Sequence, residues 1–573
     1  MEIRRLILLS IFFFSLVMLW DAWQQYNNPR EAASMASSPA SSGVPAVPAP
    51  TPPMAAPVPS ASSGAVPAAA PATVEAMGAA GKGETIEIRT DLFTAQVSTL
   101  GGDLIGLELH NYKATEDSSR NFKLFDIQHK YAAQSGLIGE GLPNHKTVFS
   151  PLPGKRELSG GEESIQLKLE APAVNGVKVS KVYTFKRNSY LIGLVHEIDN
   201  GGQKEIAAHA YYQLQRDTQA PAGESSMVST FTGPAEYTEQ GKFQKIDFKD
   251  IEKGSAKFEQ KADNGWMAMI QHYFVSAWIP QENLPREFYA RSLEGGANPV
   301  VAAGLIVPVP AIAPGGKLDY SASLYAGPQI QSILNQLSKP VAEGGIGAQG
   351  LSLVVDYGWL TIVAAPIFWL LEVINKVIGN WGWSIVILTI LIKALFFPLS
   401  AASYKSMAKM RALAPRLQVL KERCGDDKQK LNMEMMNLYK MEKVNPLGGC
   451  LPILIQIPVF IALYWALLGA VEMRNAPWIL WIQDLSSQDP YYVLPIVMMV
   501  TMLVQTKLNP TPPDPMQAKI AMIMPFAFGI MFFFFPAGLV LYWVVNNLLS
   551  IAQQWQITRL IERGGKAAND AKA

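Results

Sequence analysis

The sequence predicts a membrane protein with six transmembrane helices, a large all-β domain outside the cytoplasm and a cytoplasmic helical hairpin. Of its 573 residues, 49% are hydrophobic and only 17% are charged. Together with long uncharged runs, this balance is typical of a membrane protein with a soluble part. The second observation is an apolar–polar alternation of period two across residues 83–328, which is typical of many short strands. The net charge of +1 provides no field to attract nucleic acid, so no nucleic-acid site is expected.

The N-terminal segment over residues 1–23 is predicted to be a transmembrane anchor. Arg4 and Arg5 precede an apolar run over residues 6–20 and keep the N-terminus in the cytoplasm. The run is short enough for a cleaved signal peptide, but no small-x-small cleavage site follows it directly, which favours an uncleaved anchor. Residues 24–82 are rich in Ala, Pro and Ser and cannot bury a core, so they are predicted to form a disordered linker.

Residues 83–335 are predicted to form a large antiparallel sandwich. Alternating segments such as 85–89 and 164–170 are separated by turn clusters such as Gly101-Gly102-Asp103. All six histidines lie in this domain without metal-ligand spacing or a nucleophile motif, which favours structural or surface roles over a metal or catalytic site. The domain contains no cysteine, so no disulfide framework holds it.

The segment over residues 351–379 allows two interpretations. It is apolar enough to cross a membrane, but Pro366, Glu372 and Lys376 interrupt it and another apolar stretch follows at once. We expect an amphipathic helix on the outer membrane surface; a genuine span would reverse the orientation of everything downstream. Residues 403–445 contain ten Lys or Arg against five acids, which indicates a cytoplasmic segment and favours the surface helix.

Five further spans are predicted over residues 383–401, 450–471, 490–507, 520–536 and 538–557. Residues 402–449 are predicted to form the cytoplasmic helical hairpin, and residues 558–573 a basic cytoplasmic tail. Within the hairpin, Gly425 suits the end of one helix and a following Asp can cap the next. Methionines along the hairpin fit either helix packing or an adaptable surface for apolar partners, and both interpretations stay open.

One cation lies inside the first of these spans. A Lys at a helix centre in a membrane costs roughly 2.5 to 3.5 kcal/mol, so Lys393 is expected to face a bundle interior or a wet cavity. Thr389 precedes it by four residues, on the same helical face. The alternative is that Lys393 snorkels to the inner headgroups. No acidic residue lies mid-span and no repeated halves are visible, which disfavours a proton relay and a secondary transporter.

Several long motifs resemble the YidC/Oxa/Alb insertase family of Gram-negative type across essentially the whole chain. They include Tyr404-Lys-Ser-Met-Ala-Lys-Met-Arg, Met441-Glu-Lys-Val-Asn-Pro-Leu-Gly-Gly-Cys450 and Pro536-Ala-Gly-Leu-Val-Leu-Tyr-Trp543. The resemblance implies a periplasmic β-supersandwich and a five-helix core with a hydrophilic groove, in the bacterial inner membrane with both termini cytoplasmic. It implies a membrane protein insertase and chaperone rather than an enzyme, without metal or cofactor.

By position, the resemblance also implies the site residues. The groove or substrate-sliding residues are Lys393, Thr389, Gln456, Phe460, Gln505, Tyr542 and Trp543. Contacts with clients or the ribosome fall on Met407, Met410, Lys421, Arg423, Asp426 and Asp427. The family commonly has Arg where this chain has Lys393, which keeps the charge but loses the planar fork.

The implied partners are nascent membrane proteins, Sec translocon components, the ribosome, the signal recognition particle receptor and membrane lipids. Two alternative functions stay open from the residues alone: a small-solute transporter and a periplasmic sugar-binding or epimerase-like enzyme.

Overall fold

The computed structural model describes residues 83–570, except 116, 118, 222–229, 282, 295–297, 358–359, 426, 443–450 and 510–514. The predicted anchor over residues 1–23 and the predicted linker over residues 24–82 lie outside the described residues, as does Asp426. The described chain consists of a strand-rich part followed by a helical part.

The first sheet of the strand-rich part has the order β1-β2-β3-β5-β10-β17-β16-β13, with β4 paired to β3. All of its named strand pairs are antiparallel. Its strands are β1 Thr85–Arg89, β2 Phe93–Ser98, β3 Leu104–Lys113, β4 Asn121–Phe125, β5 Ala132–Ile138, β10 Ile206–Asp217, β13 Lys261–Ala262, β16 Arg286–Glu294 and β17 Val300–Ile312.

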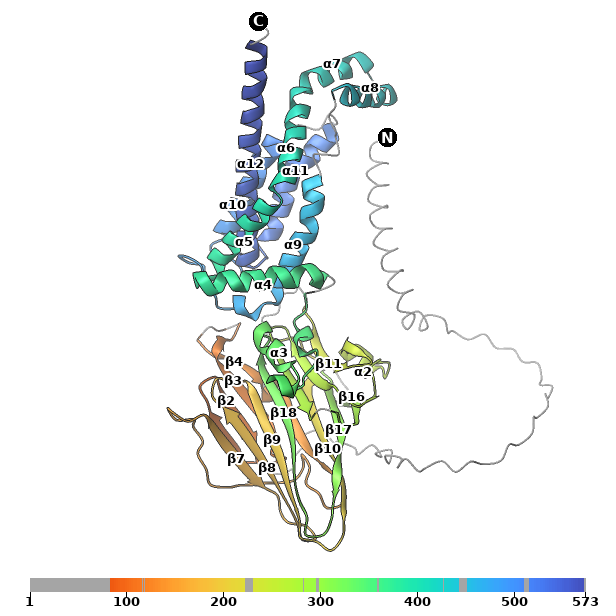
Figure 1. Cartoon of the computed structure of the whole chain (residues 1–573), viewed down its shortest axis with the longest axis vertical. Helices are drawn as coiled ribbons and strands as arrows, with labels where there is room; N and C mark the ends of the chain where they lie inside the picture. Colours follow the sequence, from red (N-terminus) through yellow and green to blue (C-terminus); the bar gives the residue numbers. More distant parts are fainter. Residues whose placement is uncertain are drawn as a thin grey trace, which may run out of the picture. The chain divides into compact units, whose positions relative to one another are not determined.

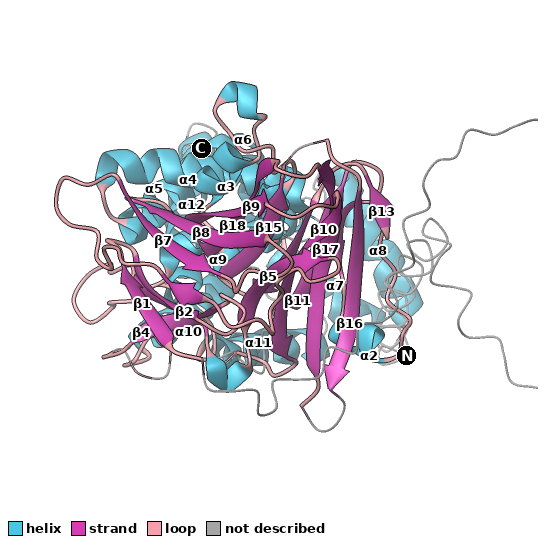
Figure 2. Cartoon of the chain, turned by 90° about the horizontal axis from the view of Figure 1, so that it is seen from below, coloured by secondary structure: helices cyan, strands magenta, loops and turns pink. Residues whose placement is uncertain are grey.

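The second sheet has the order β12-β11-β14-β15-β18-β9-β8-β7-β6 and is also antiparallel. Figure 2 shows β7, β8 and β18 of this sheet, and β10, β17 and β16 of the first. Its strands are β6 Ser150–Pro151, β7 Ser164–Glu170, β8 Val177–Lys186, β9 Leu191–Asn200, β11 Thr232–Thr238, β12 Lys242–Lys245, β14 Trp266–Gln271, β15 Phe274–Pro280 and β18 Lys317–Pro328.

Alternating burial explains why these segments form a sandwich. In β7, Ile165, Leu167 and Leu169 are buried, whereas the residues between them are exposed or half-buried. Successive strand residues point to opposite faces of a sheet, so this alternation buries one face of β7 and leaves the other toward solvent. Trp266 and Trp278 are the largest side chains buried in the sandwich. The predicted all-β sandwich is therefore confirmed, and two short helices, α2 Phe248–Glu252 and α3 Gln331–Leu337, accompany it.

The helical part confirms the predicted helical C-terminal region. Figure 1 shows α4 running across the ends of neighbouring helices, and α4 packs against α5 and α9. Its helices are α4 Thr361–Ile378, α5 Trp381–Leu395, α6 Phe397–Ala412, α7 Ala414–Cys424, α8 Lys428–Met441, α9 Leu451–Gly469, α10 Val493–Leu508, α11 Pro515–Phe532 and α12 Ala537–Asp570.

Local capping residues separate α4 from α5. Gly379 adopts φ +71°, which ends α4 in the left-handed conformation that glycine tolerates best. The side chain of Asn380 then accepts a hydrogen bond from the backbone N–H of Trp383 at 3.1 Å and caps α5. The chain therefore changes direction within two residues.

The helix predicted over residues 383–401 differs from the structure. Helix α5 ends at Leu395, and α6 continues after a bend of 67°. Pro398 supplies a physical reason, because it lies in the first turn of α6 and lacks the backbone N–H that would continue the hydrogen bonds of α5 across the bend. Helix α6 extends to Ala412, well into the segment predicted as the hairpin, and α12 likewise runs to Asp570 through most of the predicted tail.

By length and composition, α4 is the one described helix that can cross a membrane by itself, and the bent pair α5–α6 is a second when counted as one span. Shorter apolar helices cover Gln456–Gly469, Val493–Leu508 and Ala518–Phe532. The number and the orientation of the spans therefore stay predictions.

Candidate functional site

Lys393 on α5 is the centre of a polar cluster among the helices. Its side chain is 7% exposed, and its Nζ donates hydrogen bonds to Ser550 Oγ at 2.7 Å and to Gln456 Oε1 at 3.4 Å. In the described part of the chain no carboxylate lies within ion-pair distance of this ammonium group. A buried cation is thus bound by neutral acceptors only.

The acceptors of Lys393 are connected through α12. Gln456 Nε2 donates to Asn546 Oδ1, and Ser550 Oγ donates to the backbone carbonyl of Asn546 at 2.7 Å. Asn546 and Ser550 lie four residues apart, on one face of α12. We call Lys393, Gln456, Asn546 and Ser550 the Lys393 cluster; it joins α5, α9 and α12.

A cavity of about 20 Å³ adjoins the Lys393 cluster at the bend between α5 and α6. This volume holds roughly one water molecule. Its lining comprises Ile392, Lys393, Phe396, Leu399, Ser400, Gln456 and Val459. The bend after Leu395 positions residues of α6 beside Lys393, so the local kink forms part of the polar space.

Aromatic side chains lie next to the cluster along the same helices. Phe460 follows Gln456 by one turn of α9 and packs edge-on against Trp543, with ring centroids 4.6 Å apart. The ring of Tyr542 stacks on Phe460 at 6.4 Å. Five of the seven groove residues implied by the resemblance therefore lie in one region: Lys393, Gln456, Phe460, Tyr542 and Trp543.

The other two groove residues are not joined to the cluster. Thr389 is buried, and its Oγ1 donates to the backbone carbonyl of Ile385 at 2.7 Å, within its own helix. Gln505 is half-buried on α10, and none of the described hydrogen bonds connects it to Lys393 or Gln456. From α10, Thr501 instead accepts a bond from Asn547 at 3.3 Å.

Sequence reasoning missed Ser550, the nearest partner of Lys393. One signal could have found it: Ser550 is a small hydroxyl residue four positions after Asn546 in the same predicted span. A serine at that spacing shares a face with the amide side chain.

The described residues among those implied to contact clients or the ribosome lie on α6, on α7 and at the N-cap of α8. Met407 and Met410 are half-buried on α6, whereas Lys421, Arg423 and Asp427 are exposed. Gly425 adopts φ +53° after α7, and Asp427 caps α8 by accepting bonds from the N–H groups of Gln429 and Lys430 at 3.1 and 3.0 Å. The predicted roles of Gly425 and of an Asp cap are therefore confirmed.

Among the described residues no group of three or more His, Cys, Asp or Glu side chains is arranged to hold a metal ion. The Lys393 cluster provides a cation, amide groups and hydroxyl groups, so it can bind polar or anionic groups through hydrogen bonds.

Two family models together match most of the chain. The YidC periplasmic domain matches residues 85–370, and the 60Kd inner membrane protein matches residues 373–564. The fold, the Lys393 cluster and the two matching family models define the class of this protein. It is an inner membrane protein with a periplasmic β-sandwich domain and a helical region.

The relatives identify the family within that class. A protein of Dechloromonas aromatica named membrane protein insertase YidC is 62% identical, covering 100% of both chains. A protein of the same name from Aromatoleum aromaticum is 55% identical, again over 100% of both chains. A crystal structure of an active YidC insertase with its first transmembrane domain resolved covers 83% of this chain and 92% of its own, with 18% identity and a TM-score of 0.41. The chain belongs to the YidC family of membrane protein insertases.

Proposed function

We propose that this chain inserts integral membrane proteins into the bacterial inner membrane, with nascent membrane proteins as clients. Support comes from relatives of that name, 62% and 55% identical over the full length. The relatives favour this function over a small-solute transporter and over a sugar-binding or epimerase-like enzyme. One structural observation carries the mechanism: Lys393 is buried between helices, and its partners in the described part of the chain are neutral.

The proposed topology has six spans with both termini in the cytoplasm, and α4 lies along the periplasmic membrane surface. Ile362, Trp369, Val373 and Val377 are exposed on one face of α4, whereas Ala364, Phe368 and Leu371 are buried on the other. A helix that is apolar on both faces fits a position between the protein core and the lipid interface. Its course across the ends of its neighbours supports the same placement (Figure 1).

In the proposed mechanism, a polar client segment exchanges hydrogen bonds with the Lys393 cluster. Polar backbone at membrane depth is costly unless it is hydrogen-bonded, and Lys393, Gln456 and Asn546 supply partners there. The cavity of about 20 Å³ is too small for a peptide, so α5 and α6 must separate from α9 to admit one. An acidic segment gains most, because its carboxylate adds an ionic attraction to the hydrogen bond that the Lys393 ammonium group donates.

Release is proposed to follow from partition of the client's own apolar span into lipid. Burial of apolar surface contributes about 25 cal/mol per Å². A membrane potential adds about 2.3 kcal/mol per charge per 100 mV. These two sources move the client without any chemical reaction in the chain.

The cytoplasmic helices α6 to α8 are the proposed receiving surface for the ribosome, the signal recognition particle receptor and Sec components. Lys421 and Arg423 present exposed cations there. Met433, Met436 and Met441 are exposed on α8. Methionine is flexible and polarisable, so this surface can adapt to apolar segments of varied shape.

Insertion by the purified full-length chain in liposomes that contain no other protein tests the proposal. The client is a single-span protein with a short acidic outer segment, and protease protection reports insertion. We expect Lys393→Ala to lower insertion by about tenfold or more, since a hydrogen bond to a charged group is worth about 1.5 to 3 kcal/mol. Lys393→Arg should retain most of it.

Lys507→Ala is the matched control, because Lys507 is an exposed cation on α10, outside the Lys393 cluster and outside the proposed receiving surface. It should insert the client like the unmodified chain. Full activity of Lys393→Ala would refute the role of the cluster, whereas no insertion above empty liposomes by the unmodified chain would refute autonomous insertion.

A further inference from the structure

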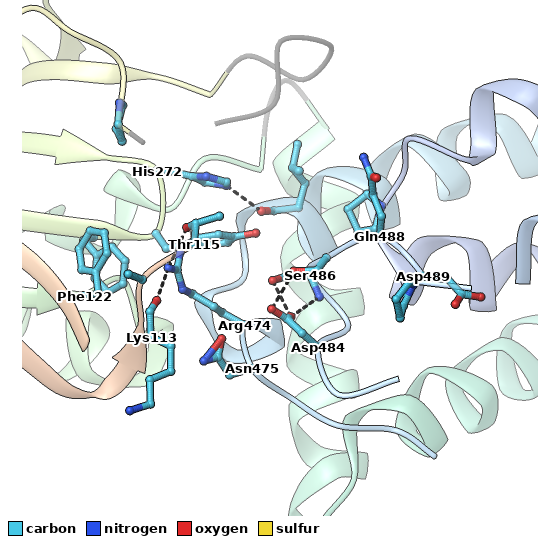
Figure 3. Close-up of a pocket in the computed structure, with 18 of the residues that line it drawn as sticks. Lys113, Thr115, Phe122, His272, Arg474, Asn475, Asp484, Ser486, Gln488 and Asp489 are labelled. Carbon is cyan, nitrogen blue, oxygen red and sulfur yellow. Dashed lines mark hydrogen bonds between the residues drawn. The ribbon is translucent and has the colours of Figure 1, made fainter. Parts of the chain in front are cut away.

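A second cavity, of about 610 Å³, lies where the sandwich meets the loop between α9 and α10 (Figure 3). The sandwich contributes Lys113, Phe122 and His272 to its lining. The loop contributes Arg474, Asn475, Asp484, the residues from Ser486 to Pro490, and Tyr492. Its size falls within the range of ordinary ligand sites. The Lys393 cluster contributes no residue to it.

Arg474 is held rigidly at the wall of this cavity. Its Nη2 donates to the backbone carbonyl of Lys113 at 2.6 Å and to Thr115 Oγ1 at 3.0 Å. Its guanidinium carbon lies 5.3, 5.6 and 5.4 Å from the ring centroids of Phe122, Tyr273 and Phe274. None of the hydrogen bonds in the described part of the chain uses Nε or Nη1. Arg474 is therefore a preorganised cation with donors left for an anion.

Asp484 provides a negative charge in the same lining. Its carboxylate accepts bonds from the Ser486 N–H at 2.8 Å, from Ser486 Oγ at 2.7 Å and from Ser487 Oγ at 2.8 Å. Within the described residues, Arg474 and Asp484 do not form an ion pair, although both side chains line the cavity (Figure 3). Two opposite charges thus remain separated, as the two charges of a zwitterionic ligand require.

The remaining charges of the lining balance. Lys113 donates to Asn121 Oδ1 at 2.8 Å, and Asp489 accepts bonds from Trp481, Tyr491 and Leu494 at the start of α10. Burial lowers the pKa of His272 to about 4, so its imidazole is neutral at pH 7. With two cations and two anions, the lining favours a ligand without net charge over a simple anion.

The rim of the cavity is apolar and continues onto the helices. Tyr492 and Phe534 both line the cavity and are 42% and 48% exposed. Beyond them Ile496 on α10 and Ile530 on α11 are exposed as well, and α10 packs against α11. Aromatic side chains between a polar pocket and an apolar helical surface are typical of the membrane interface. The ligand should therefore have a polar head and an apolar tail.

We propose that this cavity binds the zwitterionic headgroup of a membrane phospholipid. The phosphate contacts Arg474, the ammonium group contacts Asp484, and the acyl chains lie along α10 and α11 past Tyr492 and Phe534. The bound lipid would join the sandwich to the helical core at the outer membrane surface. The site is separate from the proposed client groove and goes beyond the insertion function.

The test is native mass spectrometry of the full chain, delipidated in detergent and titrated with phosphatidylethanolamine or phosphatidylglycerol. We expect one tightly retained phosphatidylethanolamine per chain and weaker binding of phosphatidylglycerol. Arg474→Gln and Asp484→Asn should each weaken retention of phosphatidylethanolamine by about tenfold or more, the scale expected for one charge-assisted hydrogen bond. Asp484→Asn leaves the contacts between Arg474 and the sandwich in place. It therefore tests binding of the headgroup without disturbing the contact between the sandwich and the loop.

Lys245→Gln is the matched control, because Lys245 is a cation at the neighbouring cavity that pairs with Asp356. It should retain the lipid. Equal binding of both lipids with no effect of Asp484→Asn would overturn the proposal, as would displacement of the lipid by inorganic phosphate, which indicates an anion site only. If Arg474→Gln and Asp484→Asn both retain the lipid unchanged, the lipid binds elsewhere, and this outcome would also overturn the proposal. The readout is binding, so its failure is distinguishable from failure of insertion.

Discussion

The sandwich and the helical core each bury a lysine, but different kinds of groups contact its charge in the two regions. In the sandwich, Lys181 is 0% exposed, and its Nζ donates to the carbonyls of Gly101 at 2.6 Å and Ser135 at 2.8 Å, with Asp103 Oδ1 at 3.8 Å. Among the described residues of the helical core, the acceptors of Lys393 are a hydroxyl and an amide. The first cation has a carboxylate beside it, whereas the second has neutral partners among the described residues.

The free-energy cost of burying a charge explains why the difference between the two lysines is informative. Removing a charge from water costs several kcal/mol, which a carboxylate and well-placed carbonyls offset in the sandwich. In the helical core, none of the described residues supplies a carboxylate to Lys393 to offset this cost. A structural role does not require such an arrangement, because an apolar residue would pack there at less cost. The uncompensated lysine is therefore the better candidate for function.

The largest expected effect is on the sandwich. Lys181→Met should destabilise it by about 3 to 5 kcal/mol, because Asp103 is then left buried without its cation. Hydrogen exchange of the β5 and β8 amides in the full chain measures the loss. Lys317→Met removes an exposed ion pair with Asp199 in the same domain and should cost far less, because water screens exposed pairs. Equal losses of stability in the two variants would contradict the interpretation that Lys181 and Asp103 form a stabilising buried pair.

The pH dependence of stability, an effect of intermediate size, tests whether the sandwich tolerates an unpaired buried charge. Glu236 is buried and accepts a bond from the Glu259 N–H at 2.6 Å, and burial raises its pKa to about 7. The folded state then binds a proton that the unfolded state releases near pH 4.5. The contribution to stability is full below pH 4.5 and is lost as the pH rises toward 7.

The substitution Glu236→Gln removes this titrating carboxyl. Between about pH 5 and pH 8, the unmodified chain should therefore lose about 1 to 3 kcal/mol more free energy of unfolding than the variant does. The difference between the two unfolding curves over that range measures it, and Glu239→Gln, at an exposed position of the following turn, is the control. Parallel curves for the Glu236→Gln variant and the unmodified chain would show that the carboxyl stays charged in the fold.

The smallest expected stability effect is at Lys393. Lys393→Met relieves a buried charge but leaves Ser550 and Gln456 without that donor, so the two contributions offset each other to within about 1 kcal/mol. Thermal unfolding of the full chain in detergent measures this change. A loss as large as that of Lys181→Met would make Lys393 a structural residue and weaken the contrast between the regions.

Several features could be predicted because they depend on neighbouring residues. The alternation in β7, the break at Gly379 and Asn380, and the cap at Asp427 are local, and each has a physical signal within a few residues. The polar surroundings of Lys393 could also be predicted, because a lone cation in an apolar run is costly wherever the run packs.

Other features depend on residues far apart. The sheet order places β5 beside β10 and β9 beside β18, which no local pattern encodes. Pro398 was visible in the sequence, but the 67° bend and the cavity beside it emerged only from packing. Thr389 shares a helical face with Lys393 yet bonds its own backbone, since a threonine hydroxyl reaches the carbonyl four residues back.

The sequence by itself determined which segments are strands and helices, which charges flank them and that Lys393 needs a polar surrounding. Those properties follow from periodicity, capping and the cost of a charge in an apolar segment. Only the tertiary structure decided that the surrounding is Gln456, 63 residues away, and Ser550, 157 residues away. Such partners are selected by how α5, α9 and α12 pack together, because hydrogen bonds depend on distances in space and not on spacing along the chain.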